Sequence, residues 1–317
     1  MFTLIELEDA AALVYQSFPG TPQYAWPLLA ERLGTEVWVK HENHTPTGAF
    51  KVRGGLVYAT MLKRERPDVA GMISATRGNH GQSLAYAGTR AGIQVTIVMP
   101  AGNSVEKNAA MRAFGARLVE HGADFEGAVA EARRLAEAEG LEFVPSFHPD
   151  LVRGVATYSL ELFRDVPDLD VLYAPIGLGS GICGAIRARD VMGLTTEIVG
   201  VQSTGADSYA RSLAAGHAVS LNRAVTHADG MATRQTDPDA LAMIRRGAAR
   251  IVTVSDDEIA LAIRAYWTDT HNLAEGAGAA PLAAALQEKD HLRGKRVGVV
   301  LSGGNIDLSL FRSWVLG

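Results

Sequence analysis

The sequence predicts an α/β protein built from two parallel-sheet units. Short apolar runs typical of strands alternate with longer runs typical of helices, and three strands end in glycine-rich turns. The chain has 317 residues, enough for two domains of ordinary size. Alternation of strands and helices implies parallel sheets with helices covering both faces.

The first half of the chain alternates regularly. Four strands are predicted from their apolar runs: 36–40, 71–76, 95–100 and 117–121. The predicted helices lie between and after them: 49–65, the segment from Gly78 through "GQSLAYAGTRAG", 105–116 and 125–140. This strand–helix series predicts the first parallel sheet.

The second half repeats the pattern. Strands are predicted at 171–177, 197–203 and 296–305, and helices at 183–193 and 256–271. We place a boundary near "PSFHPDL" (145–151). Residues 70–148 are then a small unit, and residues 1–69 plus 149–317 form a large one.

Composition excludes several classes of protein. Apolar residues make up 47% and charged residues 21% of the chain, and the net charge is 30 − 35 = −5 without a long basic run. Nucleic acid and anionic membranes are therefore not expected partners. The N-terminus is acidic rather than basic, and no apolar run approaches the ~20 residues of a membrane span. Cys183 is the only cysteine, so a reducing, cytoplasmic location is expected.

Glycine-rich turns follow three predicted strands, at 74–82, 175–184 and 301–305. In open parallel sheets, ligands bind where strands end. "GLGSG" (177–181) opens a helix and offers backbone N–H groups to a phosphate, although a tight turn that binds nothing has the same pattern. The strand after it ends in Gln202-Ser203 without the acid that a dinucleotide site needs, so a small phosphate-bearing cofactor is favoured over NAD.

Lys51 stands in an apolar, glycine-flanked run, "HENHTPTGAFKVRGG". One interpretation is a solvated lysine at the start of a helix. The other is a reactive amine, because a desolvated lysine has a lowered pKa and can attack a carbonyl group. Pyridoxal 5′-phosphate is a phosphorylated aldehyde that needs such a lysine, a phosphate site and a group facing its pyridine nitrogen. The Ser302 hydroxyl in "LSGGN" could be that group, or an ordinary turn serine.

Four motifs occur together in order: "HENHTPTGAFKVRGG", "RGNHGQ", "GLGSG" and "LSGGN". In this combination the chain resembles the fold-type II pyridoxal-phosphate enzymes, in particular the serine/threonine dehydratase family, from Thr21-Pro22 to Asn305. The resemblance implies a large cofactor-binding domain and a small substrate-loop domain, with the cofactor between them. It also implies a homodimer.

The resemblance assigns roles to individual residues. Lys51 would form the Schiff base with pyridoxal 5′-phosphate and act in catalysis. The other implied cofactor-binding residues are Phe50, Asn79, Gly177, Leu178, Gly179, Ser180, Gly181, Glu275 and Ser302. The implied substrate-binding residues are Thr76, Arg77, Gly78, Asn79 and His80.

The sequence departs from the family at three places. Arg77 stands where racemases of this family have a catalytic serine, and its high pKa makes it a poor second acid/base. It is either a solvated loop residue or a contact to a substrate anion. Metal-binding members carry an acid at the position of Gln202, so no metal is expected. Tyr24 and Trp26 are core or interface residues, unless they line the pocket and favour an aromatic substrate.

Other polar residues have simpler interpretations. His80, His148 and His271 have no metal-ligand spacing, and we interpret His80 as supporting its loop, with catalysis as the alternative. The acids at 256–258 suit a helix N-terminus. The sequence does not assign a role to "DG" at 229–230.

We expect β-elimination from a β-hydroxy-α-amino acid, giving a 2-oxo acid and ammonia. Threonine and serine are the family's substrates, with phenylserine and 3-hydroxyaspartate as the alternatives suggested by the aromatics and by Arg77. A racemase, a β-replacement synthase and a non-catalytic cofactor-binding protein are the competing hypotheses. The chain ends soon after "LSGGN", so we expect neither a C-terminal regulatory domain nor feedback regulation.

Overall fold

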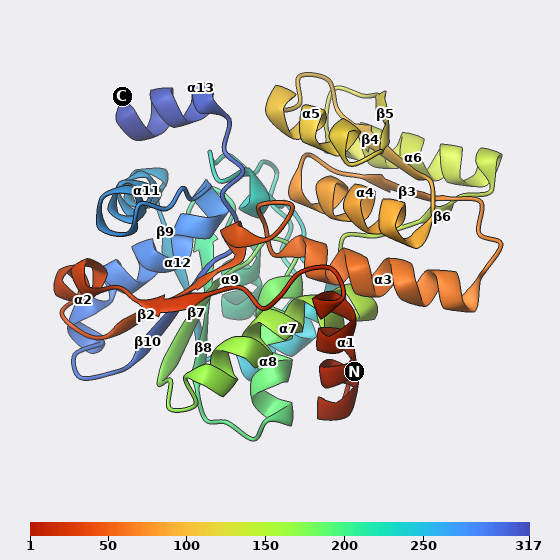
Figure 1. Ribbon diagram of the computed structural model, residues 1–317. Coiled ribbons are helices and arrows are strands. Elements are labelled where there is room, and N and C mark those ends of the chain that lie inside the picture. The colour runs from red at the N-terminus through yellow and green to blue at the C-terminus, as the bar shows by residue number, and fades with distance from the viewer.

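Two β-sheets organise the molecule. The computed structural model describes all 317 residues, and Figure 1 shows the arrangement of its elements. The strands are β1 (Gln23–Ala25), β2 (Val37–His41), β3 (Met72–Ala75), β4 (Val95–Met99), β5 (Arg117–Glu120), β6 (Glu142–Phe143), β7 (Val171–Pro175), β8 (Glu197–Ser203), β9 (Arg250–Val254) and β10 (Val297–Leu301). A six-stranded sheet has the order β1-β2-β10-β7-β8-β9, and a four-stranded sheet has the order β5-β4-β3-β6.

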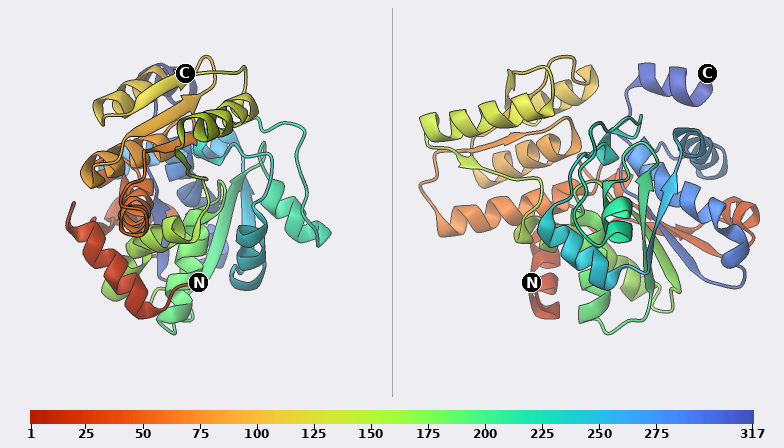
Figure 2. Two further views of the ribbon diagram at one scale, coloured as in Figure 1. Left: turned by 90° about the vertical axis from the view of Figure 1, so that its right-hand side faces the viewer. Right: turned by 180° about the vertical axis from the view of Figure 1, so that it is seen from behind.

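Helices connect and cover these strands. The α-helices are α1 (Leu4–Tyr15), α2 (Pro27–Leu33), α3 (Lys51–Glu65), α4 (Asn79–Ala91), α5 (Val105–Ala113), α6 (Phe125–Glu139), α7 (Pro149–Asp165), α8 (Ser180–Val191), α9 (Ser208–Ala215), α10 (Pro238–Gly247), α11 (Asp256–Thr270), α12 (Gly276–Gln287) and α13 (Leu308–Leu310). Short helical turns are η1 (Glu42–His44), η2 (Asp229–Met231), η3 (Lys289–His291) and η4 (Phe311–Leu316). The elements from β3 to α6 lie together, at the upper right of Figure 1 and the upper left of the rear view in Figure 2.

The strand pairing brings distant segments together. All pairs are parallel except β1 with β2. Strand β10 lies between β2 and β7, with Leu301 paired to His41 and Val299 to Tyr173. Because parallel strands end at the same edge of a sheet, the segments after β2, β7 and β10 leave the large sheet side by side.

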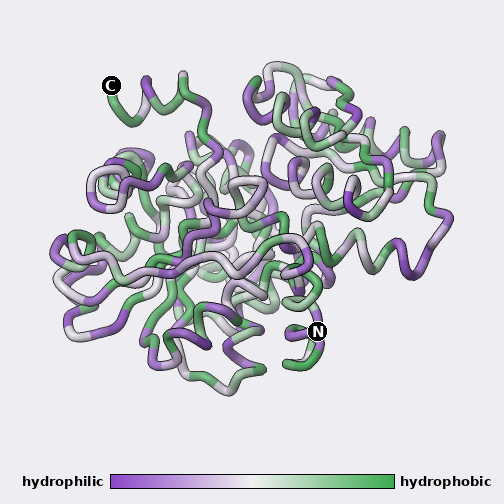
Figure 3. Tube along the Cα trace, in the orientation of Figure 1, coloured by the Kyte–Doolittle hydropathy of each residue, from purple (hydrophilic) through white to green (hydrophobic).

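Both faces of the large sheet are buried, as a parallel sheet requires. One apolar core includes α12, in which ten of twelve residues are buried, and the other core is built largely on α7 and α8. In Figure 3 the hydrophobic colour runs along the central strands, and the hydrophilic colour lies mainly on outer turns and helices. The rigid sheet therefore holds the turns at its carboxyl edge in fixed positions.

The predicted fold class, two parallel-sheet α/β units, is confirmed. The predicted strand at 197–203 has the bounds of β8, but the helix predicted from residue 49 begins at Lys51. Ala49 instead lies in a turn that the Thr45 side chain closes by bonding to both its N–H and its C=O. The division of the chain at residues 70 and 148 stays a prediction.

Some elements were not predicted from the sequence. The longest helix, α7, follows the proposed boundary directly, and α12 is apolar on all sides and so lacks the amphipathic period. No helix combines the length and the hydrophobicity that crossing a membrane requires.

Candidate active site

The predicted cofactor residues line one cavity at the carboxyl edge of the large sheet. Lys51 comes from the segment after β2, Ser302 directly follows β10, and the 177–181 turn follows β7. The cavity is lined by Phe50, Lys51, Asn79, Pro175, Gly177, Leu178, Gly179, Ser180, Gly181, Gly230, Met231, Glu275, Ala277 and Ser302. Every residue predicted from the sequence to contact the cofactor is in this set.

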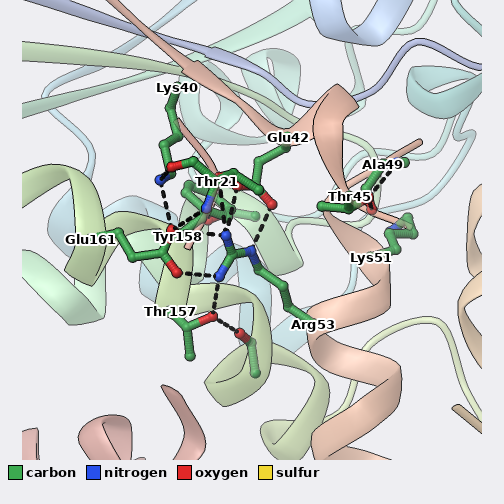
Figure 4. Close-up of polar contacts among 12 residues, drawn as sticks. Thr21, Lys40, Glu42, Thr45, Ala49, Lys51, Arg53, Thr157, Tyr158 and Glu161 are labelled. Carbon is green, nitrogen blue, oxygen red and sulfur yellow. Dashed lines mark hydrogen bonds and ion pairs between the residues drawn. The ribbon is translucent and has the colours of Figure 1, made fainter. Parts of the chain in front are cut away.

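The turn before Lys51 is fixed by its own side chains and by the 302–305 turn. Figure 4 shows Thr45 bonded to Ala49, next to Lys51 at the start of α3. Gly48 has a φ of +68°, and a Cβ there would lie 2.6 Å from the Asn305 side chain, so only glycine fits. The Phe50 N–H donates to the Ser302 carbonyl at 2.9 Å. Lys51 therefore starts α3 from a rigid turn.

Lys51 lies in a desolvated environment. Its side chain is half-buried, and its Nζ lies 5.0 Å from the centre of the Phe50 ring. Burial lowers the pKa of Lys51 to about 8, and the Glu275 carboxylate opposes this shift. A lysine with this pKa is partly neutral near physiological pH, as a nucleophile or base requires.

The 177–181 turn is built from backbone that tolerates few side chains. Gly179 has a φ of +100° and caps the N-terminus of α8. A Cβ at Gly177 would lie 2.4 Å from the carbonyl oxygen of Gly230, so the close approach of η2 excludes any larger residue. Side-chain hydroxyls fix the carbonyls of the turn: Thr233 donates to Gly177, Tyr209 to Leu178, and Tyr158 to Gly181. A rigid glycine turn at a helix N-terminus is a suitable site for a phosphate.

Asn79, Glu275 and Asn305 form a hydrogen-bonded chain at the cavity. Asn79 donates to Glu275 Oε1 at 2.6 Å and accepts from Asn305 at 2.8 Å. The other oxygen, Glu275 Oε2, is buried without a hydrogen-bond partner. Burial raises the pKa of Glu275 to about 7, although the nearby Lys107 cation opposes the shift. This carboxyl group can therefore exchange a proton near neutral pH.

The predicted substrate loop lies at the N-terminus of α4. Thr76, Gly78 and His80 are buried, and the Gly78 N–H bonds to the Thr76 hydroxyl. Burial lowers the pKa of His80 to about 3, and the charge of Lys51 adds to the effect, so His80 is neutral. Arg77 is exposed. Apart from Asn79, none of these residues lines the cavity around Lys51.

Tyr24 and Trp26 lie elsewhere, on and just after the edge strand β1. Their rings pack edge to face, 5.6 Å apart, and the Trp26 indole donates to His41 at 2.9 Å. Trp26 also packs against the large core, while half of Tyr24 is exposed. Neither lines the cavity around Lys51, so the condition that would favour an aromatic substrate is not met.

Several other polar residues stabilise helix ends or the backbone. His148 caps the N-terminus of α7, and His271 ends α11 in the left-handed conformation. The acids at 256–258 form the first turn of α11, as predicted. Gln202 is buried and bonds to the backbone of Ala206 and Ala210. The expectation of no metal stays a prediction.

A buried charge network was missed in the sequence. Figure 4 shows the Arg53 guanidinium between the carboxylates of Glu42 and Glu161, with Thr21 and Lys40 beside them. Arg53, Glu42 and Lys40 are fully buried. Lys40 bonds to Glu161 at 2.6 Å, so two cations neutralise two anions. The network ties the first turn of α3, two residues from Lys51, to β2 and α7.

One sequence signal for the network was present. Lys40 and Glu42 stand at the end of a predicted strand that is otherwise mainly apolar. Charged residues in such a buried strand are expected to have partners of opposite charge. Their partner Glu161 is far along the chain, on a helix that was not predicted, so the pairing itself could not be read.

The fold and the site define a class of protein. A desolvated lysine faces a glycine turn at a helix N-terminus, across the carboxyl edge of a parallel sheet, as in an enzyme that binds a phosphorylated aldehyde cofactor. Residues 14–303 match the model of a family described as pyridoxal-phosphate dependent enzymes.

Similarity to individual proteins supports the same family. The chain is 34% identical to an L-threonine ammonia-lyase of Thermotoga maritima, over 98% of this chain and 77% of that protein. It is 31% identical to an L-threo-3-hydroxyaspartate ammonia-lyase of Saccharomyces cerevisiae, over 98% and 95%. The solved structure of maize serine racemase superimposes with a TM-score of 0.92, at 27% identity over 98% of this chain and 96% of that one.

The chain therefore belongs to the pyridoxal-phosphate dependent enzymes of fold type II, within the serine/threonine dehydratase family. The predicted cofactor and the predicted lyase class are confirmed. The residues present also fit the cofactor, because the lysine is desolvated and the glycine turn leaves no room for a Cβ at Gly177.

Proposed function

We propose that this enzyme removes water from a β-hydroxy-α-amino acid and releases a 2-oxo acid and ammonia. The substrate is of the threonine and serine type or carries a second carboxylate, as 3-hydroxyaspartate does. The observation that carries the proposal is the meeting of the Lys51 amine, the 177–181 turn and Ser302 in one cavity. The ammonia-lyase names of the relatives support the reaction type.

In this proposal each part of the cavity has one task. The backbone N–H groups of the 177–181 turn hold the cofactor phosphate, with the helix dipole of α8 behind them. Phe50 would flank the ring, Asn79 would bond its hydroxyl, and Ser302 would face its nitrogen. When bound, pyridoxal 5′-phosphate supplies an electron sink for the bond that breaks at the substrate α-carbon.

The chain's own residues then do the remaining chemistry. The N-terminus of α4 and the 76–80 loop hold the substrate carboxylate through backbone N–H groups. The Lys51 amine is partly neutral, because burial lowers its pKa to about 8. In this neutral form it takes the α-proton of the substrate. The α-proton and the β-hydroxyl together leave as water, and the enamine that remains of the substrate hydrolyses to the 2-oxo acid and ammonia.

A racemase on the same scaffold is the second candidate, since the solved structure of maize serine racemase is so similar. Racemisation needs a second acid or base on the opposite face of the substrate. Arg77 stands at the loop position where the family's racemases have a serine, and a guanidinium does not release a proton near neutral pH. Elimination is therefore favoured. A β-replacement synthase would need a second nucleophile's site, which no feature of the cavity supports.

The test is ammonia release from four L-β-hydroxy amino acids: threonine, serine, threo-phenylserine and threo-3-hydroxyaspartate. Cofactor-loaded protein should release ammonia from at least one, and the K51A variant from none. Chiral chromatography of the same samples measures racemisation. Racemisation without ammonia would contradict the proposal, as would ammonia only after addition of a second nucleophile. The family resemblance also supports a homodimer, which light scattering tests, and a cytoplasmic location stays a prediction.

A further inference from the structure

Lys107 joins the predicted substrate loop to the carboxyl group of Glu275. It lies in the first turn of α5 with only 6% of its surface exposed. Its stem passes the predicted substrate loop: a Cβ added at Gly78 would lie 2.7 Å from Lys107 Cδ. Gly78 has a φ of −178°, outside the left-handed region, so it is the Lys107 stem rather than the backbone conformation that crowds a side chain at this position.

The ammonium group of Lys107 reaches the other part of the site. Its Nζ lies 3.8 Å from Glu275 Oε2, the buried oxygen without a hydrogen-bond partner, and 2.5 Å from Asp229 Oδ2. Glu275 Oε1 is held by Asn79, which lines the cavity around Lys51. The lysine thus contacts the loop with its carbons and the active-site carboxyl group with its charge.

The base of Lys107 is held firmly. The Ser104 hydroxyl accepts from the Lys107 N–H at 3.0 Å and donates to Asp307 at 2.6 Å. The neighbouring Glu106 accepts from the N–H of Leu308 at 2.9 Å. These bonds anchor the first turn of α5 to the segment after β10, which limits how far the ammonium group can move.

We propose that Lys107 is a positioning residue of the active site: its stem sets the Thr76–Gly78 loop and its ammonium sets the Glu275 carboxyl group, so that the two act together. The role of the loop in holding substrate rests on the proposed function. The link between Lys107 and Glu275 rests on the contacts alone.

The charges around Glu275 give the link a measurable consequence. Lys107 and Asp229 face it, Lys51 lies across the cavity, and His227 and Asp307 line the adjoining cavity. Lys107 and Lys51 lower the pKa of Glu275, whereas burial and Asp229 raise it. Removing the Lys107 charge while keeping its stem should therefore raise the pH at which Glu275 titrates.

The first experiment follows that titration without substrate. Carboxyl infrared spectra of the cofactor-loaded protein are recorded against pH, and E275Q identifies the Glu275 band. K107M should raise the midpoint by about one pH unit, the usual size for loss of a nearby opposite charge. K107R should keep it near the wild-type value, and the exposed-lysine control K289M should not move it. D229N should lower it, which provides a test if K107M does not fold. An unchanged midpoint in K107M or in D229N overturns the electrostatic part.

The second experiment tests the stem with a double-mutant cycle. G78A should lower the denaturant midpoint of unfolding in the wild-type background and lower it much less in K107A, which leaves room for the new Cβ. Equal effects in the two backgrounds overturn the packing part.

Neither experiment uses turnover, so failure of the proposed function shows separately. If no β-hydroxy amino acid releases ammonia and K107M still shifts the Glu275 titration, the proposed reaction is wrong and the link between Lys107 and Glu275 stands. If ammonia is released and the titration does not shift, the electrostatic link between Lys107 and Glu275 is wrong and the reaction stands.

Discussion

The backbone N–H of Phe50 donates a hydrogen bond of 2.9 Å to the carbonyl oxygen of Ser302. This bond joins the turn that precedes Lys51 to the turn that follows the last strand of the sheet. The two side chains assigned to opposite ends of the cofactor ring are therefore linked through the backbone, by this bond and by the bond from the Gly304 N–H to the Gly48 carbonyl. The bond depends on no side chain, so substitutions at Lys51 and at Ser302 test the chemistry of each residue with little change to the frame.

The first prediction concerns Lys51. Replacing it with alanine should abolish the absorbance band of the lysine-bound cofactor and all ammonia release, because no other amine lines the cavity. K63A, a change near the far end of the same helix, should keep both. Absorbance spectroscopy and an ammonia assay measure the two effects. A K51A protein with full activity would end the proposed mechanism.

The second prediction concerns pH. Burial lowers the pKa of Lys51 from its ordinary value of 10.5 to about 8, so the nucleophilic neutral amine is present at a lower pH than in a solvated lysine. In cofactor-free protein, the rate of cofactor capture should rise through pH 8 and level off above it. Because Glu275 raises the pKa of Lys51, E275Q should move this midpoint to lower pH. A rate that keeps rising to pH 10 would mean that Lys51 is solvated.

The third prediction concerns the buried charge network. R53M should destabilise the fold by about 3–5 kcal/mol, because it leaves the buried carboxylates of Glu42 and Glu161 with less compensating charge. The control R293M removes an exposed ion pair with Asp290 and should change stability little. Urea unfolding of both variants provides the measurement. A loss below about 1 kcal/mol in R53M would show that water or rearrangement replaces the missing cation.

The fourth prediction concerns Arg77. The side chain is exposed, so R77A should not lower the unfolding midpoint. If Arg77 binds a second carboxylate, R77A should raise KM for 3-hydroxyaspartate by about tenfold or more and leave threonine unchanged, since a charge-assisted bond contributes about 1.5–3 kcal/mol. Equal losses for both substrates would assign Arg77 to the shared carboxylate. Unchanged kcat/KM for both would make it a solvated loop residue.

The sequence predicted the parts of the cavity that are encoded locally. Short sequence motifs contain each of the main cavity residues: Lys51, Asn79, the 177–181 turn, Glu275 and Ser302. The carboxyl ends of parallel strands lie at the same edge of a sheet, which brings the segments that follow them close together. These residues meet in one cavity because of the order of the strands in the sheet. That order could be expected only from the family that the motifs resemble.

What escaped prediction depends on partners far apart in the chain. The contact of Lys107 with Glu275 joins α5 to the start of α12, and no local pattern marks it. Glu161 lies on α7, which was not predicted although its sequence is amphipathic, and its partners Lys40 and Arg53 stand more than 100 residues earlier. Tyr24 and Trp26 were ambiguous because an aromatic residue suits a pocket, a core and a strand edge equally well.

The central position of β10 also has a consequence for biosynthesis. This strand is made after the other nine, yet it fills the gap between β2 and β7. Until it leaves the ribosome, the nascent chain holds two apolar strands with unpaired edges and no complete cofactor cavity. Such edges invite pairing with other chains. Cofactor capture by the growing polypeptide should therefore begin only after residue 302 emerges, and a chain that stalls earlier should depend on chaperones to stay free of aggregates.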